Sequence, residues 1–461
     1  MAQTQQIPVK VGEEITVEIN GYATQGEGVG RYKGFTIFVP NSLDGETVLT
    51  RIEMVKKNYA RGELVLVLKD APQRVEPACS LYALCGGCQL LHLNYQGQLE
   101  FKRQRLIDVL ERLGGFKGVE VHPVIGMPEP WKYRNKVQYP FAINDEGKVV
   151  IGCYQQGTHD VVDTGECLIQ HDLNSRIMNR VRELTQGMGI SVYDEKTGQG
   201  LLRYVLVKNG FESGEAMVVL VTSSPEFPEG KELARMLATG FPELKSVVQN
   251  INTSGGNVVL GDRNKILYGE EGIIDRLGDL EFKISATSFF QVNPAQTKIL
   301  YQKALEYASL TGKERVLDAY CGVGTLTLFL AKKAKEVYGI EVIPEAIEDA
   351  EENAIRNQAK NVTFVMGATE DVLPKLVNIG IDFDVAVVDP PRSGCEERVL
   401  QTFVQVQVER IVYVSCNPST LARDLKFLVN RGYKIKEIQP IDMFPHTYHV
   451  ECVVLVSRVE G

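Results

Sequence analysis

The stretch Val316-Leu317-Asp318-Ala319-Tyr320-Cys321-Gly322-Val323-Gly324-Thr325 joins an apolar, strand-like run to a segment with helical character. Similar apolar runs recur at residues 337–341, 362–365, 384–389, 410–415 and 450–456, with helical segments between most of them. Continuous apolar strands that alternate with helices indicate a parallel sheet covered on both faces. We therefore expect residues 281–461 to form a doubly wound, Rossmann-like α/β domain.

The loop within this stretch has the character of a cofactor site. Gly322 and Gly324 allow the backbone to turn tightly and to approach a ligand. Glu341 closes the second strand, 23 residues after Asp318, where a carboxylate can accept hydrogen bonds from ribose hydroxyls. A dinucleotide site would have three glycines and would leave the helix amino end free for pyrophosphate. Only Gly-x-Gly is present here, which favours S-adenosylmethionine, because this cofactor carries no phosphate.

The first part of the chain has a different pattern of apolar residues and glycines. Residues 1–72 contain short strand-like runs separated by glycine-containing turns, which predicts a small, OB-like β-barrel. Residues 73–280 mix helical and strand-like segments in a central α+β domain, which begins with a predicted helix over residues 94–113. Three domains agree with the length of 461 residues at about 150 residues per domain.

Composition excludes several classes of protein. The hydrophobic fraction of 44% and the charged fraction of 24% are globular averages and exclude a mainly disordered, collagenous or coiled-coil chain. No apolar run approaches the roughly 18 residues that span a bilayer, and the amino terminus has no secretory signal pattern. We therefore expect a cytoplasmic protein. The net charge of -9 argues only weakly against nucleic acid, because such binding depends on local patches.

Three further motifs follow strand ends, where open α/β sheets bind their ligands. They are Asp389-Pro390-Pro391-Arg392, Ser415-Cys416-Asn417-Pro418 and Phe444-Pro445-His446-Thr447-Tyr448-His449-Val450-Glu451. A cysteine on such a loop is placed for attack rather than for packing. Carbon 5 of uracil becomes reactive toward a methyl donor only after a thiolate adds at carbon 6, and a base must later remove the proton at carbon 5. Cys416 suits the first role and Glu451 the second.

Together with Ser288-Phe289-Phe290-Gln291-Val292-Asn293, these motifs give the chain its resemblance to the RNA uracil-5-methyltransferases. The resemblance covers nearly the whole chain, and residues 1–72 look like the TRAM RNA-binding domain of this family. It is greatest toward the bacterial enzymes for 23S ribosomal RNA, in particular the Gram-positive enzymes that modify two uridines. The RNA cytosine-5-methyltransferases differ, because they place a cysteine directly after the proline where this chain has Arg392.

The resemblance implies roles for the matching residues. Cys416 would be the nucleophile and Glu451 the base, and either Phe289 or Phe290 would lie near the flipped base. Thr325 replaces an asparagine found in some members, so no cofactor contact is expected there. The residues that would bind or frame S-adenosylmethionine are Gln291, Tyr320, Glu341 and Asp389.

A group of cysteines lies outside these motifs, at Cys79, Cys85, Cys88 and Cys167. Four thiolates suit either zinc or an iron–sulfur cluster, and spacing alone does not decide between them. The ribosomal RNA members of the family carry a four-iron four-sulfur cluster on this pattern, so the resemblance favours iron. Cys153 is a rival for the fourth position, although Cys167 fits the family better.

The expected partner is 23S ribosomal RNA, with no membrane and no protein partner inferred. The target uridine must be flipped or unpaired, because a duplex hides carbon 5 and carbon 6. Alternatives are a transfer RNA uridine methyltransferase, a catalytically inactive RNA-binding assembly factor and an iron–sulfur redox protein that binds RNA. Two basic sets are candidates for phosphate contacts: Lys33, Arg51, Lys56, Lys57 and Arg61 in the barrel, and Lys102, Arg103, Arg105, Arg112, Lys117, Lys132, Arg134 and Lys136 beyond it.

Overall fold

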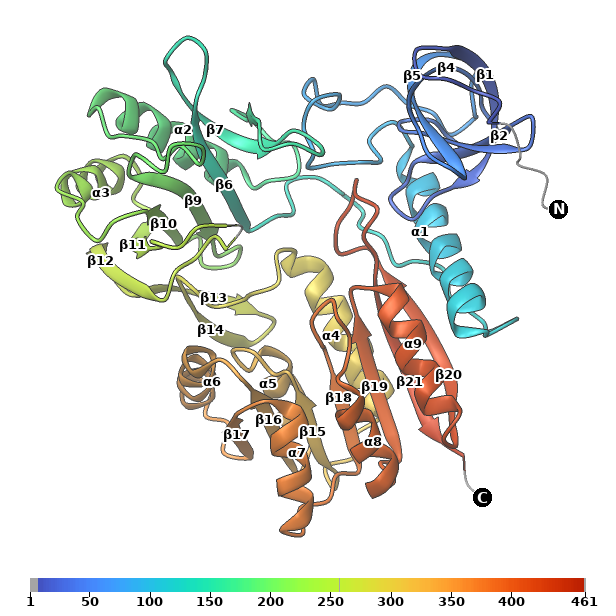
Figure 1. Cartoon of the computed structure of the whole chain (residues 1–461). Helices are drawn as coiled ribbons and strands as arrows, with labels where there is room; N and C mark the ends of the chain where they lie inside the picture. The colour runs from blue at the N-terminus through green and yellow to red at the C-terminus, as the bar shows by residue number, and fades with distance from the viewer. Residues whose placement is uncertain (1–6, 257, 460–461) are drawn as a thin grey trace.

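The computed structural model describes residues 7–256 and 258–459 (Figure 1). Its amino-terminal part is a closed barrel with strand order β1-β2-β3-β5-β4, which confirms the predicted small barrel. Alternate residues of β1 are buried inside it, as a strand with one wet face requires. Gly30 allows close strand pairing, because a Cβ there would lie 2.3 Å from the carbonyl oxygen of Glu18. The strands are β1 (Glu14–Tyr22), β2 (Gly28–Tyr32), β3 (Phe35–Val39), β4 (Thr47–Val55) and β5 (Tyr59–Lys69).

The barrel is followed by a long loop and the predicted helix, α1 (Tyr95–Val109), which continues into one π-helical turn, Leu110–Gly114. The helix begins where the Asn94 side chain accepts the backbone N–H of Gly97 at 2.8 Å. It ends at Gly115, whose φ of +80° is a left-handed conformation that glycine adopts without strain. Figure 1 shows α1 descending from the barrel beside the carboxyl-terminal sheet.

The central part is built on a seven-stranded sheet in the order β12-β11-β10-β9-β6-β7-β8. Two inner strands, β9 and β10, are buried along their whole length, because both faces of the sheet are covered. Helices α2 (Asp172–Gly187) and α3 (Gly230–Gly240) pack on one face. The strands are β6 (Lys136–Ile143), β7 (Val149–Tyr154), β8 (Val161–Asp163), β9 (Leu202–Asn209), β10 (Ala216–Thr222), β11 (Leu244–Ile251) and β12 (Arg263–Gly269).

The carboxyl-terminal part is the expected doubly wound domain. Its sheet has the order β17-β16-β15-β18-β19-β21-β20, in which β21 runs antiparallel to both of its neighbours. Helices α4, α5 and α6 contribute to one core, while α7, α8, α9 and the end of α1 contribute to the core on the other face. The strands are β15 (Arg315–Ala319), β16 (Glu336–Glu341), β17 (Val362–Met366), β18 (Val385–Val388), β19 (Arg410–Ser415), β20 (Tyr433–Ile441) and β21 (Glu451–Arg458). The helices are α4 (Pro294–Ala308), α5 (Thr325–Ala331), α6 (Pro344–Arg356), α7 (Thr369–Asn378), α8 (Glu397–Val406) and α9 (Pro418–Val429).

A hairpin of β13 (Gly272–Leu277) and β14 (Leu280–Ser285) joins the central and carboxyl-terminal parts. Apolar residues of β9 and β10, of this hairpin and of α4 share one continuous core. The boundary predicted at residue 280 therefore lies inside the hairpin, where both parts contribute to the packing. Within the described residues, no helix is long and apolar enough to cross a membrane.

Candidate active site

The cofactor loop leaves the end of β15 and enters α5 through three residues with positive φ. Tyr320, Gly322 and Gly324 have φ values of +68°, +55° and +78°. A Cβ on Gly324 would lie 3.0 Å from the Phe364 ring and 3.2 Å from the Cβ of Ala350, so the loop lies flat against its neighbours. The first backbone N–H groups of α5 have no partner within the helix.

Glu341 holds this loop from the neighbouring strand. Its carboxylate accepts N–H bonds from Gly322 at 3.1 Å, from Val342 at 2.8 Å and from Ile343 at 3.0 Å. Each carboxylate oxygen can accept more than one hydrogen bond, so ribose hydroxyls can still reach it. Glu341 thus lies where the sequence placed it, at the end of β16 and beside the glycine loop.

Two carboxyl groups lie at the ends of β15 and β18, and Asp318 is buried whereas Asp389 is half-buried. Asp318 accepts the hydroxyl of Thr327 at 2.5 Å, and burial raises the pKa of its carboxyl to about 7. Asp389 follows β18, and burial raises its pKa to about 6. A cationic ligand beside such carboxyls would favour their charged forms and lower both pKa values. The sulfonium of S-adenosylmethionine is a ligand of this kind.

Tyr320 extends from the glycine loop toward the start of α8. Its buried hydroxyl has no hydrogen-bond partner within the described part of the chain, and burial and the nearby Cys395 raise its pKa. The groups that suit the ribose of S-adenosylmethionine are therefore the glycine loop and the carboxylate of Glu341.

Strand register brings Cys416 and Glu451 together. In the antiparallel pair of β19 and β21, Ser415 lies opposite Cys452. One step further along the same register places Cys416 opposite Glu451, because antiparallel partners change in opposite directions. The two residues are 35 positions apart in sequence and meet at the edge of the sheet that carries the cofactor loop.

Burial opposes the ionisation of both members of this pair. Burial, and then the neighbouring charge of Glu451, raise the pKa of the Cys416 thiol to about 11. Burial, and then Asp389, raise the pKa of the Glu451 carboxyl to about 8. Arg392 lowers both pKa values and is a cation beside the reacting groups. The sequence marked Arg392 only as part of the fourth-strand motif, and the structure adds this electrostatic role.

Asn417 fixes the loop that carries Cys416. Its side-chain oxygen accepts the N–H of Ser419 at 3.1 Å and so caps α9, while its amide donates to the carbonyl oxygen of Arg392 at 2.9 Å. The loops that follow β18 and β19 are thereby held to each other. This explains why a cysteine followed by asparagine and proline suits a fixed nucleophile.

Two predicted residues in the loop before α4 are neighbours in sequence but differ in burial. Phe289 is 62% exposed, whereas Phe290 is 6% exposed and packs against Phe282. The structure does not support a direct base contact by Phe290, because its ring is enclosed in the core. Gln291 is half-buried, and its carbonyl oxygen accepts the side-chain amide of Asn135 at 3.0 Å. Only Phe289 of the two aromatic candidates is open to RNA.

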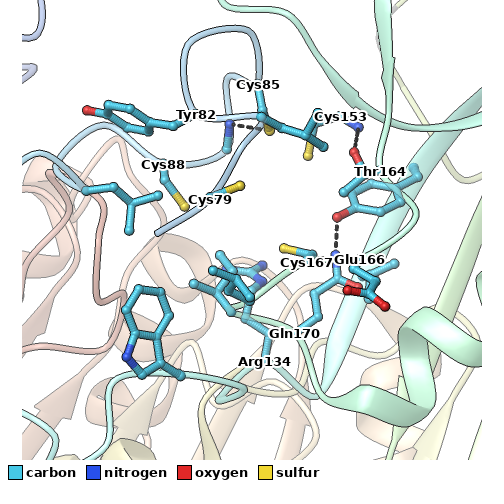
Figure 2. A pocket seen from close by; sticks show the side chains of 18 of the residues that line it. Cys79, Tyr82, Cys85, Cys88, Arg134, Cys153, Thr164, Glu166, Cys167 and Gln170 are labelled. Carbon is cyan, nitrogen blue, oxygen red and sulfur yellow. Dashed lines mark hydrogen bonds between the residues drawn. The ribbon is translucent and has the colours of Figure 1, made fainter. Parts of the chain in front are cut away.

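The predicted cysteines gather around one cavity, and a further thiol joins them. The cavity has a volume of about 370 Å³ (Figure 2). Burial, and then the charges of Cys167, Cys85 and Cys79, raise the pKa of the Cys88 thiol, and the thiol of Cys85 lies beside that of Cys153. In the described part of the chain, no three His, Cys, Asp or Glu side chains converge closely enough for a single metal ion. The thiols that line the cavity belong to Cys79, Cys85, Cys88, Cys153 and Cys167.

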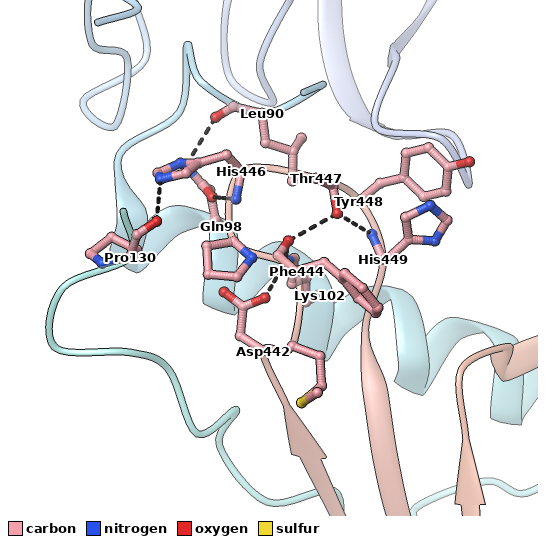
Figure 3. Close-up of polar contacts among 12 residues, drawn as sticks. Leu90, Gln98, Lys102, Pro130, Asp442, Phe444, His446, Thr447, Tyr448 and His449 are labelled. Atoms are coloured by element: carbon pink, nitrogen blue, oxygen red, sulfur yellow. Dashed lines mark hydrogen bonds and ion pairs between the residues drawn. The ribbon is translucent and has the colours of Figure 1, made fainter. Parts of the chain in front are cut away.

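The basic residues near α1 include one that is not available to phosphate. Lys102 is fully buried and forms an ion pair of 2.5 Å with Asp442, 340 residues away in sequence (Figure 3). Its ammonium also donates to the carbonyl oxygen of Phe444 at 3.0 Å. The expectation that Lys102 contributes to an exposed basic belt is therefore wrong. The pair instead holds α1 against the loop that leads to Glu451.

Comparisons with known proteins show what the chain is similar to. Residues 248–459 match the family described as tRNA (Uracil-5-)-methyltransferase, and residues 8–65 match the TRAM domain. A protein of Bacillus cereus strain ATCC 10987, named an uncharacterized RNA methyltransferase, is 51% identical over 98% of both chains. A protein of Halalkalibacterium halodurans with the same description is 47% identical over 98% of this chain and 99% of its own.

A solved structure is similar over almost the whole chain. The Pyrococcus abyssi tRNA (uracil-54, C5)-methyltransferase, in complex with S-adenosyl-L-homocysteine, has a TM-score of 0.75 and 32% sequence identity. The match covers 96% of this chain and 100% of that one. The chain therefore belongs to the S-adenosylmethionine-dependent RNA (uracil-5-)-methyltransferases and carries a TRAM domain at its amino-terminal end.

Proposed function

We propose that the protein methylates carbon 5 of uridine in 23S ribosomal RNA through a covalent adduct with Cys416. The observation that carries this proposal is the register of β19 and β21, which sets Cys416 beside Glu451 at the mouth of the cofactor loop. A nucleophile and a base are required in turn by this reaction, and here they face one site.

The reaction begins when deprotonated Cys416 forms a bond from its sulfur to carbon 6 of uracil, and the double-bond electrons move toward carbon 5 and the O4 oxygen. S-adenosylmethionine supplies the methyl group that carbon 5 then takes up. Glu451 accepts the proton from carbon 5, and the carbon–sulfur bond breaks as the 5,6 double bond is restored. Arg392 stabilises the Cys416 thiolate, which attacks carbon 6 at the start and is released at the end, because the charge of Arg392 lowers the pKa of Cys416.

Four residues would form the cofactor site. Gln291, Tyr320, Glu341 and Asp389 would hold S-adenosylmethionine, with Glu341 at the ribose. Arg392 favours the ionised form of Glu451, which is the form that can accept the proton from carbon 5. The flipped uracil would stack on Phe289, whose ring is exposed.

The cysteine cavity supports ribosomal RNA as the substrate, since the resemblance assigns a four-iron four-sulfur cluster to the ribosomal RNA members. Cys79, Cys85, Cys88 and Cys167 would hold the cluster, because their side chains line one cavity. A cluster spreads its four ligands around a cube of iron and sulfide, so the thiolates need not converge on a single point. Methyl transfer requires no electron, and we propose a structural role for the cluster.

A transfer RNA substrate is the second candidate, because the similar Pyrococcus abyssi enzyme is named for uracil 54 of transfer RNA. Purified protein should be incubated with S-adenosylmethionine and either unmodified 23S ribosomal RNA or unmodified transfer RNA. Mass mapping of nuclease fragments is expected to find a gain of one methyl group at uridine in 23S RNA only. Methylation of transfer RNA alone would contradict the ribosomal assignment, and methylation of neither would favour an inactive assembly factor.

A further inference from the structure

The loop that carries Glu451 is anchored at His446, which is a junction between two parts of the protein. The carbonyl oxygen of His446 accepts backbone N–H bonds from Gln89 and Leu90, both at 3.0 Å. These two residues directly follow Cys88, so the cysteine loop and the catalytic loop share this anchor. Figure 3 shows Leu90 and His446 side by side above the ion pair of Lys102.

The ring of His446 makes a second connection to the same cavity. It stacks on Trp131, with ring centroids 4.0 Å apart and an interplanar angle of 23°. Trp131 itself lines the cysteine cavity. The Nε2 atom of the ring lies 3.1 Å from the carbonyl oxygen of Pro130, and Nδ1 lies 3.2 Å from the Gln98 amide. The backbone of His446 therefore contacts the residues that follow Cys88, and its ring contacts Trp131, which lines the cavity.

Few conformations are open to His446. Its side chain is 3% exposed, and its φ of +68° is a left-handed value that a non-glycine residue adopts only when its surroundings enforce it. The N–H of His446 is also held, since it donates to the Gln98 side-chain oxygen at 2.9 Å. Loss of the surrounding contacts would release a strained residue, and the loop would relax away from its present course.

The chain from His446 to Glu451 is short and internally bonded. The Thr447 hydroxyl donates to the carbonyl oxygen of Phe444 at 2.9 Å and accepts the N–H of His449 at 3.2 Å. Glu451 follows as the first residue of β21. A shift at His446 is therefore passed along five residues to the carboxyl group that would take the proton from carbon 5.

We propose that Trp131 and His446 are positioning residues through which the occupant of the cysteine cavity sets the placement of Glu451. The inference rests on the proposed function for the role of Glu451, but the mechanical link from cavity to loop stands apart from it. When the cavity is filled, the loop of Cys88 is fixed and holds His446 in its left-handed conformation. When the cavity is empty, the loop that leads to Glu451 gains freedom.

Two matched variants isolate the stacking contact. Trp131→Phe keeps an aromatic ring against His446, whereas Trp131→Ala removes it. His446→Gly removes the ring but retains the backbone carbonyl and tolerates a positive φ, so it tests the link even if Trp131→Ala fails to fold. His159→Gly serves as the control, because His159 is an exposed histidine in the central part that stacks on Tyr154.

The first measurement is hydrogen–deuterium exchange of the peptide spanning residues 442–450, in full-length protein reconstituted anaerobically with iron and sulfide or stripped by a chelator. Exchange is expected to rise at least tenfold on stripping, and to rise similarly in reconstituted Trp131→Ala and His446→Gly. The Trp131→Phe and His159→Gly proteins should match wild type. Equal exchange in filled and stripped wild-type protein would overturn the link, whatever reaction the enzyme performs.

The second measurement separates bond formation from proton removal, using RNA tritiated at carbon 5 of uridine. Reconstituted Trp131→Ala is expected to form the covalent protein–RNA species at the wild-type rate but to release tritium at least tenfold more slowly, so the adduct accumulates. Equal slowing of both steps would indicate a purely structural role and overturn the positioning proposal. If no adduct forms in any protein, including wild type, the proposed function fails, while the exchange result still decides the link.

Discussion

Replacement of Glu451, the proposed base, with glutamine is expected to stabilise the folded protein at higher pH but not at low pH. Glu451 is 5% exposed and lies near Asp389, and the pKa of its carboxyl is raised to about 8 from an ordinary 4.5. The folded chain therefore holds a proton on Glu451 that the unfolded chain has lost between these two pH values. Where the folded state binds more protons, stability falls as pH rises. Glu451→Gln removes this dependence, because glutamine resembles the neutral acid.

The cost in free energy of unfolding follows from the difference between the two pKa values of Glu451. At about 1.36 kcal/mol for each pKa unit, the change from 4.5 to about 8 gives a cost of roughly 5 kcal/mol above pH 8, and roughly 3 kcal/mol at pH 7. At pH 5 the cost is below about 1 kcal/mol. Burial leaves little solvent screening of this carboxyl.

Differential scanning calorimetry at pH 5 and pH 8 measures the effect, without cofactor. Glu451→Gln should unfold several degrees above wild type at pH 8 and close to wild type at pH 5. Glu409→Gln, which changes an exposed carboxylate, should follow wild type at both values. A stability difference that is independent of pH, or a lower midpoint for Glu451→Gln at pH 8, would refute the reasoning.

The structure makes three further predictions. Phe289→Ala should weaken RNA binding about tenfold with little change in stability, because one stacked base contributes about 1–3 kcal/mol; Phe290→Ala should instead cost about 3–5 kcal/mol of folding free energy. Filter binding and urea unfolding would check both, and equal effects of the two variants would contradict the assignment. Lys102→Met leaves Asp442 as an unpaired buried charge and should cost about 3–5 kcal/mol, whereas Lys132→Met, at an exposed pair with Asp172, should cost less than about 1 kcal/mol. Urea unfolding that ranks the two lysines equally would contradict this. After anaerobic reconstitution, Cys153→Ser should keep about four irons per chain and Cys167→Ser should lose most of them. Iron and sulfide analysis with the reverse result would make Cys153 the fourth ligand.

Much of the methyltransferase part could be predicted because its chemistry lies at strand ends. Parallel strands end at the same edge of a sheet, so Gly322, Glu341 and Cys416 were expected to lie near one another from the order of their motifs. The antiparallel return of β21 is needed to bring Glu451 to this edge, whereas the chemistry of the reaction and the resemblance both predict its role as base. The closed barrel also followed from short strand-like runs and glycine turns.

Other features depend on contacts that no local pattern records. Lys102 lies among basic residues, and only the fold reveals that its partner is Asp442, hundreds of residues away. Phe289 and Phe290 are neighbours of the same type, and the local course of the chain decides which ring is buried. The sequence offers Cys153 only as a rival ligand, and it reaches the cysteine cavity because the chain just after β7 pairs with Cys85. The contact of His446 with Trp131 is likewise visible only in the folded structure.

The most direct test of the central claim uses RNA that contains 5-fluorouridine, because fluorine at carbon 5 cannot be removed as a proton. Wild-type protein with S-adenosylmethionine should form a stable complex in which mass spectrometry finds a methylated nucleotide on Cys416. Cys452→Ala, at the neighbouring buried thiol, should form the same complex, and Cys416→Ser should form none and should not methylate ordinary RNA. An adduct on another residue, or undiminished methylation by Cys416→Ser, would contradict the account.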